Sequence, residues 1–509
     1  MKQIKFIWVL IFIIGSFLRS TELFHPIDTE SWRESDMAAI SKNFYQHGMD
    51  IFHPQIAWDG SGPGYTESEF QVYTYLIAIS YKIFGVWEPT GRIISFLFSL
   101  LTMLIFFRFC RYLFDSRAAL ACSAFFALSP MLMVISNTIQ PDSVMFFFYV
   151  GSAYYFLRWI DNQSKRDYFL AILFTSLGIL CKLTAANIGI MFVLFIIYKK
   201  SWRFLLKPKV LLFGLLSLLP SIIWYSYCHQ FYLHYGNSLG ISNEYAWVGW
   251  DFFTNRSFIH GIYINELFNV WTRPGRIIVL LAIVFTKLIK KESTIISVFW
   301  LIACAVFYVI AMRTTSADWA FYYHIFSVPA ASVLLGSSVV ELYNKYSPLL
   351  YLKRKTTIDR LNFIKSILII FFLALSVSYF VIDSIKYLNQ SHSKYAVFQT
   401  SPFYSCKKIL SEKIPPGSLI LASGGVCKNG AGYPVAYNAS YFFYWLDMKG
   451  YNICTADQSF ENIISFKKKG VSFYIAEEKS LKQKPGLESE LRERLKTVLE
   501  CNGIILFKL

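Results

Sequence analysis

The stretch that decides the fold reads Phe24-His-Pro-Ile-Asp28-Thr-Glu30-Ser-Trp-Arg33-Glu-Ser-Asp36-Met-Ala-Ala-Ile-Ser-Lys-Asn-Phe44, a polar segment set among apolar runs. An apolar run at residues 4–18 precedes it, with Lys2 and Lys5 at its start. Because no small-x-small cleavage site follows this run, we expect a retained first helix and not a removed signal peptide. The polar segment then begins where the chain first leaves a membrane.

The composition favours a membrane protein over a soluble one. The chain has 509 residues, of which 55% are hydrophobic and 16% charged, and its mean hydropathy is +0.43. These values are too apolar for a soluble protein of this length. The net charge of +17 lies largely in short connections between apolar runs. Membrane topology explains this pattern better than nucleic-acid binding, so we predict no nucleic-acid partner.

The apolar runs and the basic residues together predict a topology. Twelve runs are present, at residues 4–18, 70–84, 93–107, 118–135, 144–157, 168–180, 188–198, 210–227, 277–289, 295–312, 325–342 and 366–382. If all twelve span, the basic clusters between them face outward, against the positive-inside rule. If residues 70–84 form an interfacial helix and do not span, every basic cluster lies on the cytoplasmic side. This run suits an interfacial helix because it contains Lys82 and ends at Gly85. We therefore predict about eleven spans, a cytoplasmic N-terminus and an outer C-terminal segment.

The residues after the last run have the pattern of a small α/β domain. Strands are predicted at 419–422, 471–475 and 504–507, and helices at 404–413, 460–469 and 487–499. The predicted division is a membrane domain at 1–385, with a first outer loop at 20–92, and an outer domain at 386–509. Four cysteines lie in the outer domain, where they are either free thiols or disulfides with three pairings open: Cys406, Cys427, Cys454 and Cys501.

Two aspartates in the first outer loop are candidate catalytic residues. Asp28 follows Pro26 at a position suited to a helix cap, and Met37, Ile40 and Phe44 recur behind it at helical spacing. Asp28 is thus either an N-cap or a reactive carboxylate at the membrane surface. Asp36 is likewise either a reactive carboxylate or a solvated residue on the face of the same helix.

Further charged residues favour chemistry on the outer face. Arg33 lies between the two aspartates, and a second acidic group of Asp59, Glu67 and Glu69 closes the loop. Carboxylates grouped with an arginine suit a site that binds a phosphate-linked lipid and removes a proton from an acceptor. Five more polar residues lie at predicted outer helix ends: Asp142, Lys182, Arg273, Arg276 and His324. Each of them either has a function there or only extends its polar group to the membrane interface.

The sequence resembles the polytopic glycosyltransferases of the GT-C class, in particular the protein O-mannosyltransferase and aminoarabinose-transferase type. The resemblance covers most of the membrane part. It rests on these motifs: His25-Pro-Ile-Asp28, Ala39-Ile-Ser-Lys-Asn-Phe44, Phe52-His-Pro54, Glu69-Phe70, Glu88-Pro-Thr-Gly-Arg92, Ala127-Leu-Ser-Pro130, Pro141-Asp142, Cys181-Lys182-Leu-Thr184 and Tyr322-Tyr-His-Ile-Phe-Ser-Val-Pro329.

The resemblance implies sugar transfer from a polyprenyl-phosphate donor to a glycan, lipid or protein acceptor on the outer face of a bacterial inner membrane. In the family an aspartate of the first outer loop is the general base, which favours Asp28 here, with Asp36 as its rival. Basic residues hold the donor phosphate, which assigns Arg33, Lys182, Arg273, Arg276 and His324. Glu69 matches an acidic residue that contributes to a divalent metal site in some members, and Asp59 and Asp142 are further acidic candidates.

Two departures from the family pattern limit the transfer of roles. Relatives commonly have adjacent Asp-Glu residues, whereas Thr29 separates Asp28 from Glu30 here. Phe70 stands where aminoarabinose transferases have a lysine after the acidic residue. The sugar and the acceptor therefore stay open. A lipid-linked-sugar flippase and an O-antigen polymerase are the alternative functions, less favoured because the acidic residues follow the first helix and the spans contain few carboxylates.

Overall fold

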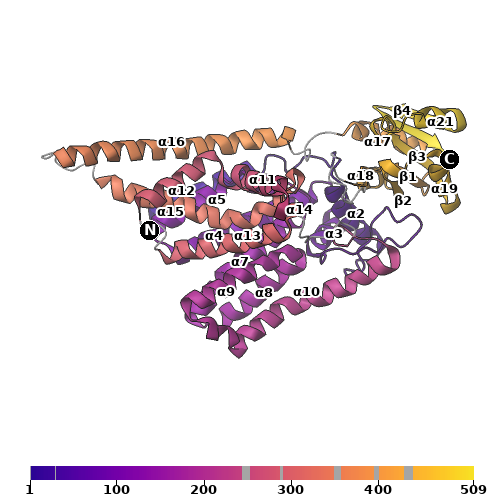
Figure 1. Cartoon of the computed structure of the whole chain (residues 1–509). Coiled ribbons are helices and arrows are strands. Elements are labelled where there is room, and N and C mark those ends of the chain that lie inside the picture. The colour runs from indigo at the N-terminus through magenta and orange to yellow at the C-terminus, as the bar shows by residue number, and fades with distance from the viewer. Residues whose placement is uncertain are drawn as a thin grey trace.

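The computed structural model describes residues 2–28, 30–242, 253–286, 291–348, 357–394, 401–428 and 439–509. Its membrane part is a helical bundle, and a small domain with a β-sheet lies at one end (Figure 1). The helices of the bundle are α1 (Lys2–Arg19), α2 (Trp32–His47), α3 (Val72–Phe84), α4 (Thr90–Leu113), α5 (Ser116–Ala127), α6 (Pro130–Ile135), α7 (Asp142–Asn162), α8 (Lys165–Cys181), η1 (Leu183–Asn187), α9 (Ile188–Lys199), η2 (Trp202–Leu206), α10 (Pro208–Tyr235), α11 (Arg256–Asn265), η4 (Glu266–Trp271), α12 (Arg273–Phe285), α13 (Glu292–Ile310), α14 (Met312–Thr315), η6 (Asp318–Ser327), α15 (Val328–Tyr346) and α16 (Thr357–Lys394).

The apolar runs of the sequence all lie on helices as far as the structure describes them. Among the described residues, five segments are long and apolar enough to cross a bilayer, namely Thr90–Leu113, Pro208–Tyr235, Glu292–Ile310, Ala320–Tyr346 and Arg360–Lys386. A sixth results if Arg256–Trp271 and Arg273–Phe285, bent by 86°, count as one broken span. The predicted polytopic helical architecture with a C-terminal α/β domain is confirmed, while the number of about eleven spans stays a prediction.

The helix α3 has the length expected of an interfacial element. It contains 13 residues, fewer than the roughly 20 that a bilayer span needs, and it ends at Gly85. Its aromatic side chains meet α2, since Tyr75 packs edge-on against Phe44 and Tyr81 against Tyr45. The helix therefore belongs to the first outer loop and covers α2.

Several basic connections between helices meet at one end of the bundle. Lys199, the last residue of α9, forms ion pairs with Asp161 at the end of α7 and with Glu292 at the start of α13. The Tyr112 hydroxyl at the end of α4 also bonds to Asp161. Near the N-terminus, Trp8 stacks on Phe107 of α4, and their ring centroids are 4.1 Å apart. Phe107 lies about two turns before the C-terminal end of α4. The N-terminus and these connections thus share one end, and the C-terminal domain lies at the other (Figure 1).

The C-terminal domain is a five-stranded sheet with helices on both faces. Strands β1 (Leu419–Ser423), β2 (Gly450–Ile453), β3 (Val471–Glu477), β4 (Lys496–Cys501) and β5 (Ile504–Lys508) have the order β2-β1-β3-β5-β4. The β1 strand is parallel to β2 and β3, and β5 is antiparallel to β3 and β4. One apolar core joins the sheet to α17 (Pro402–Lys413) and α18 (Ser440–Leu446), and another joins it to α19 (Phe460–Ser465) and α21 (Leu487–Arg494).

Most of the predicted elements of this domain are confirmed, with two differences. The three predicted strands correspond to β1, β3 and β5, but β2 was not predicted. The helix predicted at 487–499 is wrong beyond Arg494, because the residues that follow form β4. Asn502 and Gly503 both have positive φ angles and turn β4 into β5 as a tight hairpin. Asn-Gly is the strongest short hairpin signal, so this strand could have been found. The domain boundary predicted at residue 385 falls within α16.

Two disulfides connect the four cysteines of the domain. Cys406 of α17 bonds to Cys501 of β4, and Cys427 bonds to Cys454 after β2. Of the three pairings left open by the sequence, the structure has this one. Disulfides persist in oxidising compartments, which agrees with an outer location for the domain.

Opening the Cys406–Cys501 disulfide is expected to destabilise the C-terminal domain. The bond closes a loop across 95 residues. Loop-closure entropy for a chain of this length corresponds to about 4.7 kcal/mol, so Cys406→Ala together with Cys501→Ala should lower the melting temperature of the purified protein. Thermal unfolding with and without reductant measures the effect. An unchanged melting temperature in both experiments would contradict it.

Candidate active site

The helix α2 carries most of the polar residues of the first outer loop. Its N-cap is Ser31, whose side chain accepts a hydrogen bond from the Glu34 amide at 3.4 Å. The expectation that Asp28 caps this helix is therefore wrong, since Asp28 lies one turn too early. Its Oδ1 atom instead lies 2.9 Å from His25 Nε2. The helix ends at Gly48, whose φ of 111° is readily adopted only by glycine.

A cavity between α2, α8 and η6 brings together three of the predicted charged residues. Its volume is about 170 Å³, and its lining includes Arg33, Glu69 and Lys182. These residues come from α2, from the end of the first outer loop and from the position that follows α8. Aromatic side chains complete the walls: Trp32, Tyr225, Tyr322 and Tyr323. The cavity thus combines two cations with an apolar surround.

Arg33 is held from both sides at the cavity wall. Its guanidinium forms an ion pair with Glu69 and donates a hydrogen bond to the Leu239 carbonyl at 3.2 Å. Burial opposes the positive charge, but Glu69 and other acidic groups outweigh it and raise the pKa of Arg33 above its usual value. A permanently charged, oriented guanidinium is well suited to bind a phosphate through two parallel hydrogen bonds.

Lys182 is the second cation of the cavity. Its Nζ atom lies 2.8 Å from Asp142 Oδ1 and 4.5 Å from the ring centroids of both Tyr322 and Tyr323. Lys182 and Asp142 are only 6% and 2% exposed, so their ion pair is shielded from water. The two tyrosine rings face the ammonium group and stabilise its charge. No role was predicted for Tyr322 and Tyr323, because the sequence gives no sign that they contact Lys182.

Asp36 lies one helical turn beyond Arg33. It is fully buried, its Oδ1 accepts a hydrogen bond from Trp58 Nε1 at 3.1 Å, and its Oδ2 has no hydrogen-bond partner within the described residues. Burial raises the pKa of Asp36 to about 7, although Trp58, Arg33 and Ser440 partly offset this rise. A carboxylate with such a pKa suits general-base catalysis near neutral pH.

The pKa of Asp36 predicts a pH profile. The ionised carboxylate is the base, so the rate of transfer should rise about tenfold per pH unit below 7 and level off above 8. Because the folded protein holds this proton more tightly than the unfolded chain, Asp36 also lowers the free energy of unfolding as the pH rises from about 4 to 7. A rate measured between pH 5 and 9 that does not change would contradict the prediction.

Asp28 belongs to a neighbouring buried cluster. Besides the contact to His25, its backbone carbonyl accepts a hydrogen bond from the Ser401 amide at 2.7 Å. Nearby, Glu34 forms a fully buried ion pair with Arg92 at 3.2 Å and accepts a hydrogen bond from the Ile139 amide at 2.8 Å. This cluster joins the start of the first outer loop to α4 and to the segment after α6. Asp28 does not line the cavity of Arg33 and Lys182.

Glu67 fixes another wall of the cavity. Its carboxylate accepts hydrogen bonds from Ser238 at 2.6 Å and Ser242 at 3.0 Å, and it lies 2.8 Å from His229 Nδ1. Its backbone pairs with residues 237–239 in a short parallel bridge. The segment thereby held against the loop includes Leu239, Gly240 and Ile241, which line the cavity.

Asp36 and Asp142 do not themselves line this cavity, and neither do the remaining predicted site residues. Asp59 accepts a hydrogen bond from the Gly64 amide at 3.0 Å and shapes a turn. Arg273 lies over the Phe268 ring, and Arg276 donates to the Thr272 carbonyl at 3.3 Å. His324 is buried, with Nδ1 2.8 Å from Glu266 and Nε2 2.8 Å from the Thr315 carbonyl. It supports η6, which presents Tyr322 and Tyr323 to the cavity.

The C-terminal domain packs directly on the first outer loop. The Ser440 hydroxyl donates to the Trp32 carbonyl at 2.8 Å, and the Gly450 amide donates to the Ala57 carbonyl at 3.1 Å. Gly60 lies against Tyr451, where any side chain on residue 60 would collide with the ring. The domain thus helps to hold both α2 and the loop that carries Trp58, which sequence reasoning did not predict.

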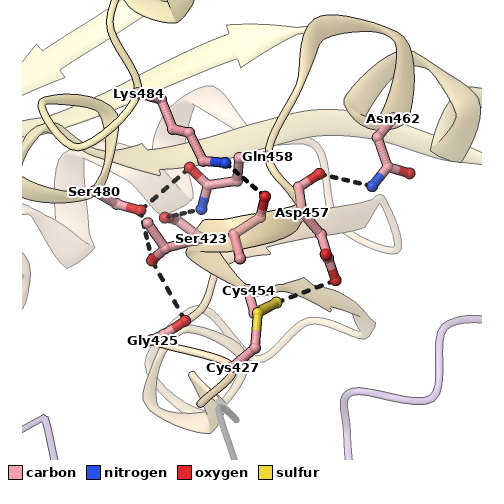
Figure 2. Close-up of a disulfide and its surroundings, with 11 residues drawn as sticks. Ser423, Gly425, Cys427, Cys454, Asp457, Gln458, Asn462, Ser480 and Lys484 are labelled. Atoms are coloured by element: carbon pink, nitrogen blue, oxygen red, sulfur yellow. Dashed lines mark hydrogen bonds between the residues drawn. A yellow bond between two sulfur atoms is a disulfide. The ribbon is translucent and has the colours of Figure 1, made fainter. Parts of the chain in front are cut away.

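The divalent metal ion that the resemblance connects with Glu69 stays a prediction. Among the described residues a single group of three metal-binding side chains lies close together, Cys427, Cys454 and Asp457. Figure 2 shows that the two cysteines are bonded to each other, with Asp457 beside Cys454. Glu69, which the resemblance connects with metal binding, is occupied by Arg33.

Comparisons with known proteins agree with this architecture. The sequence model of a family described as dolichyl-phosphate-mannose-protein mannosyltransferase matches residues 71–225. The fold is similar to that of ArnT from Cupriavidus metallidurans bound to undecaprenyl phosphate, with a TM-score of 0.61, 14% identity and 98% of each chain covered. It is also similar to the oligosaccharyltransferase AglB from Archaeoglobus fulgidus in complex with an inhibitory peptide and a dolichol-phosphate, with a TM-score of 0.55, 13% identity, and 93% of this chain and 69% of that chain covered. No curated protein sequence matches the chain.

The chain thus has the fold of these GT-C class proteins, as the sequence resemblance implied. The match to the family model lies in the membrane part, from the end of the first outer loop to α10. It includes Lys182 and Asp142, whereas Arg33 and Asp36 precede it.

Proposed function

We propose that the chain is a membrane glycosyltransferase that moves a hexose or pentose from a polyprenyl-phosphate donor to a glycan, lipid or protein acceptor. The observation that carries this function is the cavity in which Arg33 and Lys182 converge between aromatic walls. The buried Lys182 and the largely buried Arg33 together can bind a phosphate diester strongly, and the aromatic walls limit the access of water. ArnT bound to undecaprenyl phosphate and AglB bound to dolichol-phosphate have similar folds, which supports a lipid-phosphate donor.

The reaction assigns a role to each charged group. Arg33 and Lys182 bind the donor phosphate and stabilise the negative charge that it gains as a leaving group. Asp36 accepts the proton of an acceptor hydroxyl, whose oxygen attacks the anomeric carbon of the sugar. The bond between this carbon and the phosphate oxygen breaks as the new glycosidic bond forms. Glu69 and Asp142 orient the two cations.

The geometry favours Asp36 over Asp28 as the base. Asp36 is next to Arg33 on α2, and one of its oxygens has no hydrogen-bond partner within the described residues. Asp28 lies in the cluster of His25 and Glu34, away from the residues that line the cavity. Asp28, which the family resemblance favours, is the alternative that mutagenesis must test.

The proposed location is the inner membrane of a bacterium, with the site on the periplasmic face. The positive-inside pattern puts the basic connections in the cytoplasm, and the two disulfides favour an oxidising compartment for the C-terminal domain. The site and this domain lie at the same end of the bundle, because Trp32 and Ala57 contact the domain.

Analysis of surface glycans tests the proposed function. Cells without the gene should lack one sugar on an envelope glycan, lipid or glycoprotein, and the wild-type gene should restore it. Restoration should fail with Arg33→Ala, since the donor phosphate then loses a cation. Identical glycans and glycoproteins in the wild type and the deletion would overturn the proposal.

A further inference from the structure

A second polar cavity lies along α2 at the contact with the C-terminal domain. Its volume is about 300 Å³, near the lower end of the range for small-molecule sites. One side is formed by α2, and the opposite side by α18 and the three residues that follow it, Asp447, Met448 and Lys449. The cavity therefore depends on the C-terminal domain, unlike the cavity of Arg33 and Lys182.

The register of α2 connects the two cavities. Trp32, Asp36, Ala39 and Asn43 follow one another at spacings of four, three and four residues, which places them on one face of the helix. Trp32 lines the first cavity, whereas Ala39 and Asn43 line the second. Asp36 lies between them along the helix, buried and outside the lining of both cavities. Its partner Trp58 directly follows Ala57, another residue of the second cavity.

We propose that the second cavity binds the acceptor, and that the acceptor is a carbohydrate with an anionic group. This inference rests on the transferase function proposed above and adds the direction of approach to it. The donor phosphate occupies the first cavity, and the acceptor hydroxyl reaches Asp36 from the second. The proton moves from that hydroxyl to the carboxylate as its oxygen forms the new bond to the anomeric carbon.

The lining explains the class of acceptor. Asn43 and Gln46 carry amides that both donate and accept hydrogen bonds, which matches the hydroxyl groups of a sugar. The partly exposed Tyr444 offers ring surface to its C–H faces. Asn43 already donates a hydrogen bond to the Gln55 carbonyl at 2.7 Å, so a mainly apolar ligand would leave the Gln46 amide unpaired, at a cost in binding free energy.

The charge of the lining favours an anionic substituent. Lys42 forms an ion pair with Asp447 at 2.7 Å. No ion pair involves the side chain of Lys449 within the residues that the structure describes, so the cavity has an excess positive charge. A phosphate or carboxylate on the acceptor would pair with this lysine.

Kinetics with the full-length enzyme test the acceptor site. The variants are Gln46→Ala with Lys449→Ala, and Gln46→Trp, which fills the cavity; both side chains are exposed, so the fold should be retained. Lys413→Ala, an exposed lysine outside the cavity, is the matched control. The probe is envelope extract of the deletion strain, which supplies donor and unmodified acceptor. Both cavity variants should need about tenfold more extract for half-maximal transfer, while binding of undecaprenyl phosphate should equal that of the control.

The outcomes separate this inference from the proposed function. If the wild type transfers sugar and both cavity variants saturate at the same concentration of extract, the acceptor site is wrong while the transferase function stands. Transfer to a polypeptide in place of a glycan also overturns the inference. If the wild-type enzyme transfers no sugar, the proposed function fails and the acceptor site fails with it.

Discussion

Asp36→Asn is expected to lower the rate of sugar transfer by about a thousandfold, within the range that a general base contributes. The asparagine has nearly the same shape as the aspartate and can still accept the hydrogen bond from Trp58. It cannot take a proton from the acceptor hydroxyl. Because the change removes a buried charge, the melting temperature of the purified protein should stay the same or rise.

The matched control for this variant is Asp28→Asn. Asp28 contacts His25 and lies away from the cavity that binds the phosphate, so transfer should fall far less than with Asp36→Asn. Binding of undecaprenyl phosphate should be retained by both variants, since neither loses a cation. If Asp28→Asn abolishes transfer and Asp36→Asn does not, the base is Asp28, as the family resemblance favours.

Lys182→Met is expected to affect both folding and transfer. The substitution leaves the buried Asp142 carboxylate without its cation, which costs about 3–5 kcal/mol in the free energy of unfolding. It also removes a cation from the donor phosphate, and the loss of one such contact lowers the rate by about 100- to 1,000-fold. Thermal unfolding and a transfer assay measure the two effects.

A second substitution separates these two effects. Asp142→Asn in the Lys182→Met background removes the unpaired charge, so the melting temperature should return close to that of the wild type. Transfer should stay low, because the phosphate still lacks the lysine. Recovery of transfer together with stability would show that Lys182 acts only through the fold.

The sequence predicted the membrane part of the fold better than the C-terminal domain. Long apolar runs produce helices in any context, and the broken run that ends at Gly85 was correctly predicted as a short helix. The strand β4 was missed because its residues Lys496–Cys501 show no clear alternation of apolar and polar side chains that would separate a strand from the end of an amphipathic helix. The domain depends on contacts with the first outer loop, and such contacts between distant parts of the chain leave no local pattern.

Only part of the candidate site could be predicted, because contacts between distant parts of the chain leave no local pattern in the sequence. Arg33, Glu69 and Lys182 stood out as charges close to membrane helices, where charge is costly unless it has a function. Their surroundings did not stand out. Trp58 and the tyrosines of η6 are aromatic residues among many, and their contacts with Asp36 and Lys182 follow only from the packing of the helices.

The most direct test of the proposed function is mass spectrometry of the lipid donor during the reaction. Purified full-length protein is incubated with lipid and glycan extracts of the deletion strain. If the chain is a glycosyltransferase, one polyprenyl-phosphate sugar should be converted to free polyprenyl phosphate, while an acceptor gains the mass of that sugar in equal amount. The Asp36→Asn variant should leave the donor intact. A donor that stays unchanged with the wild-type protein, or one that only moves across a vesicle membrane with its sugar attached, would contradict the glycosyltransferase function.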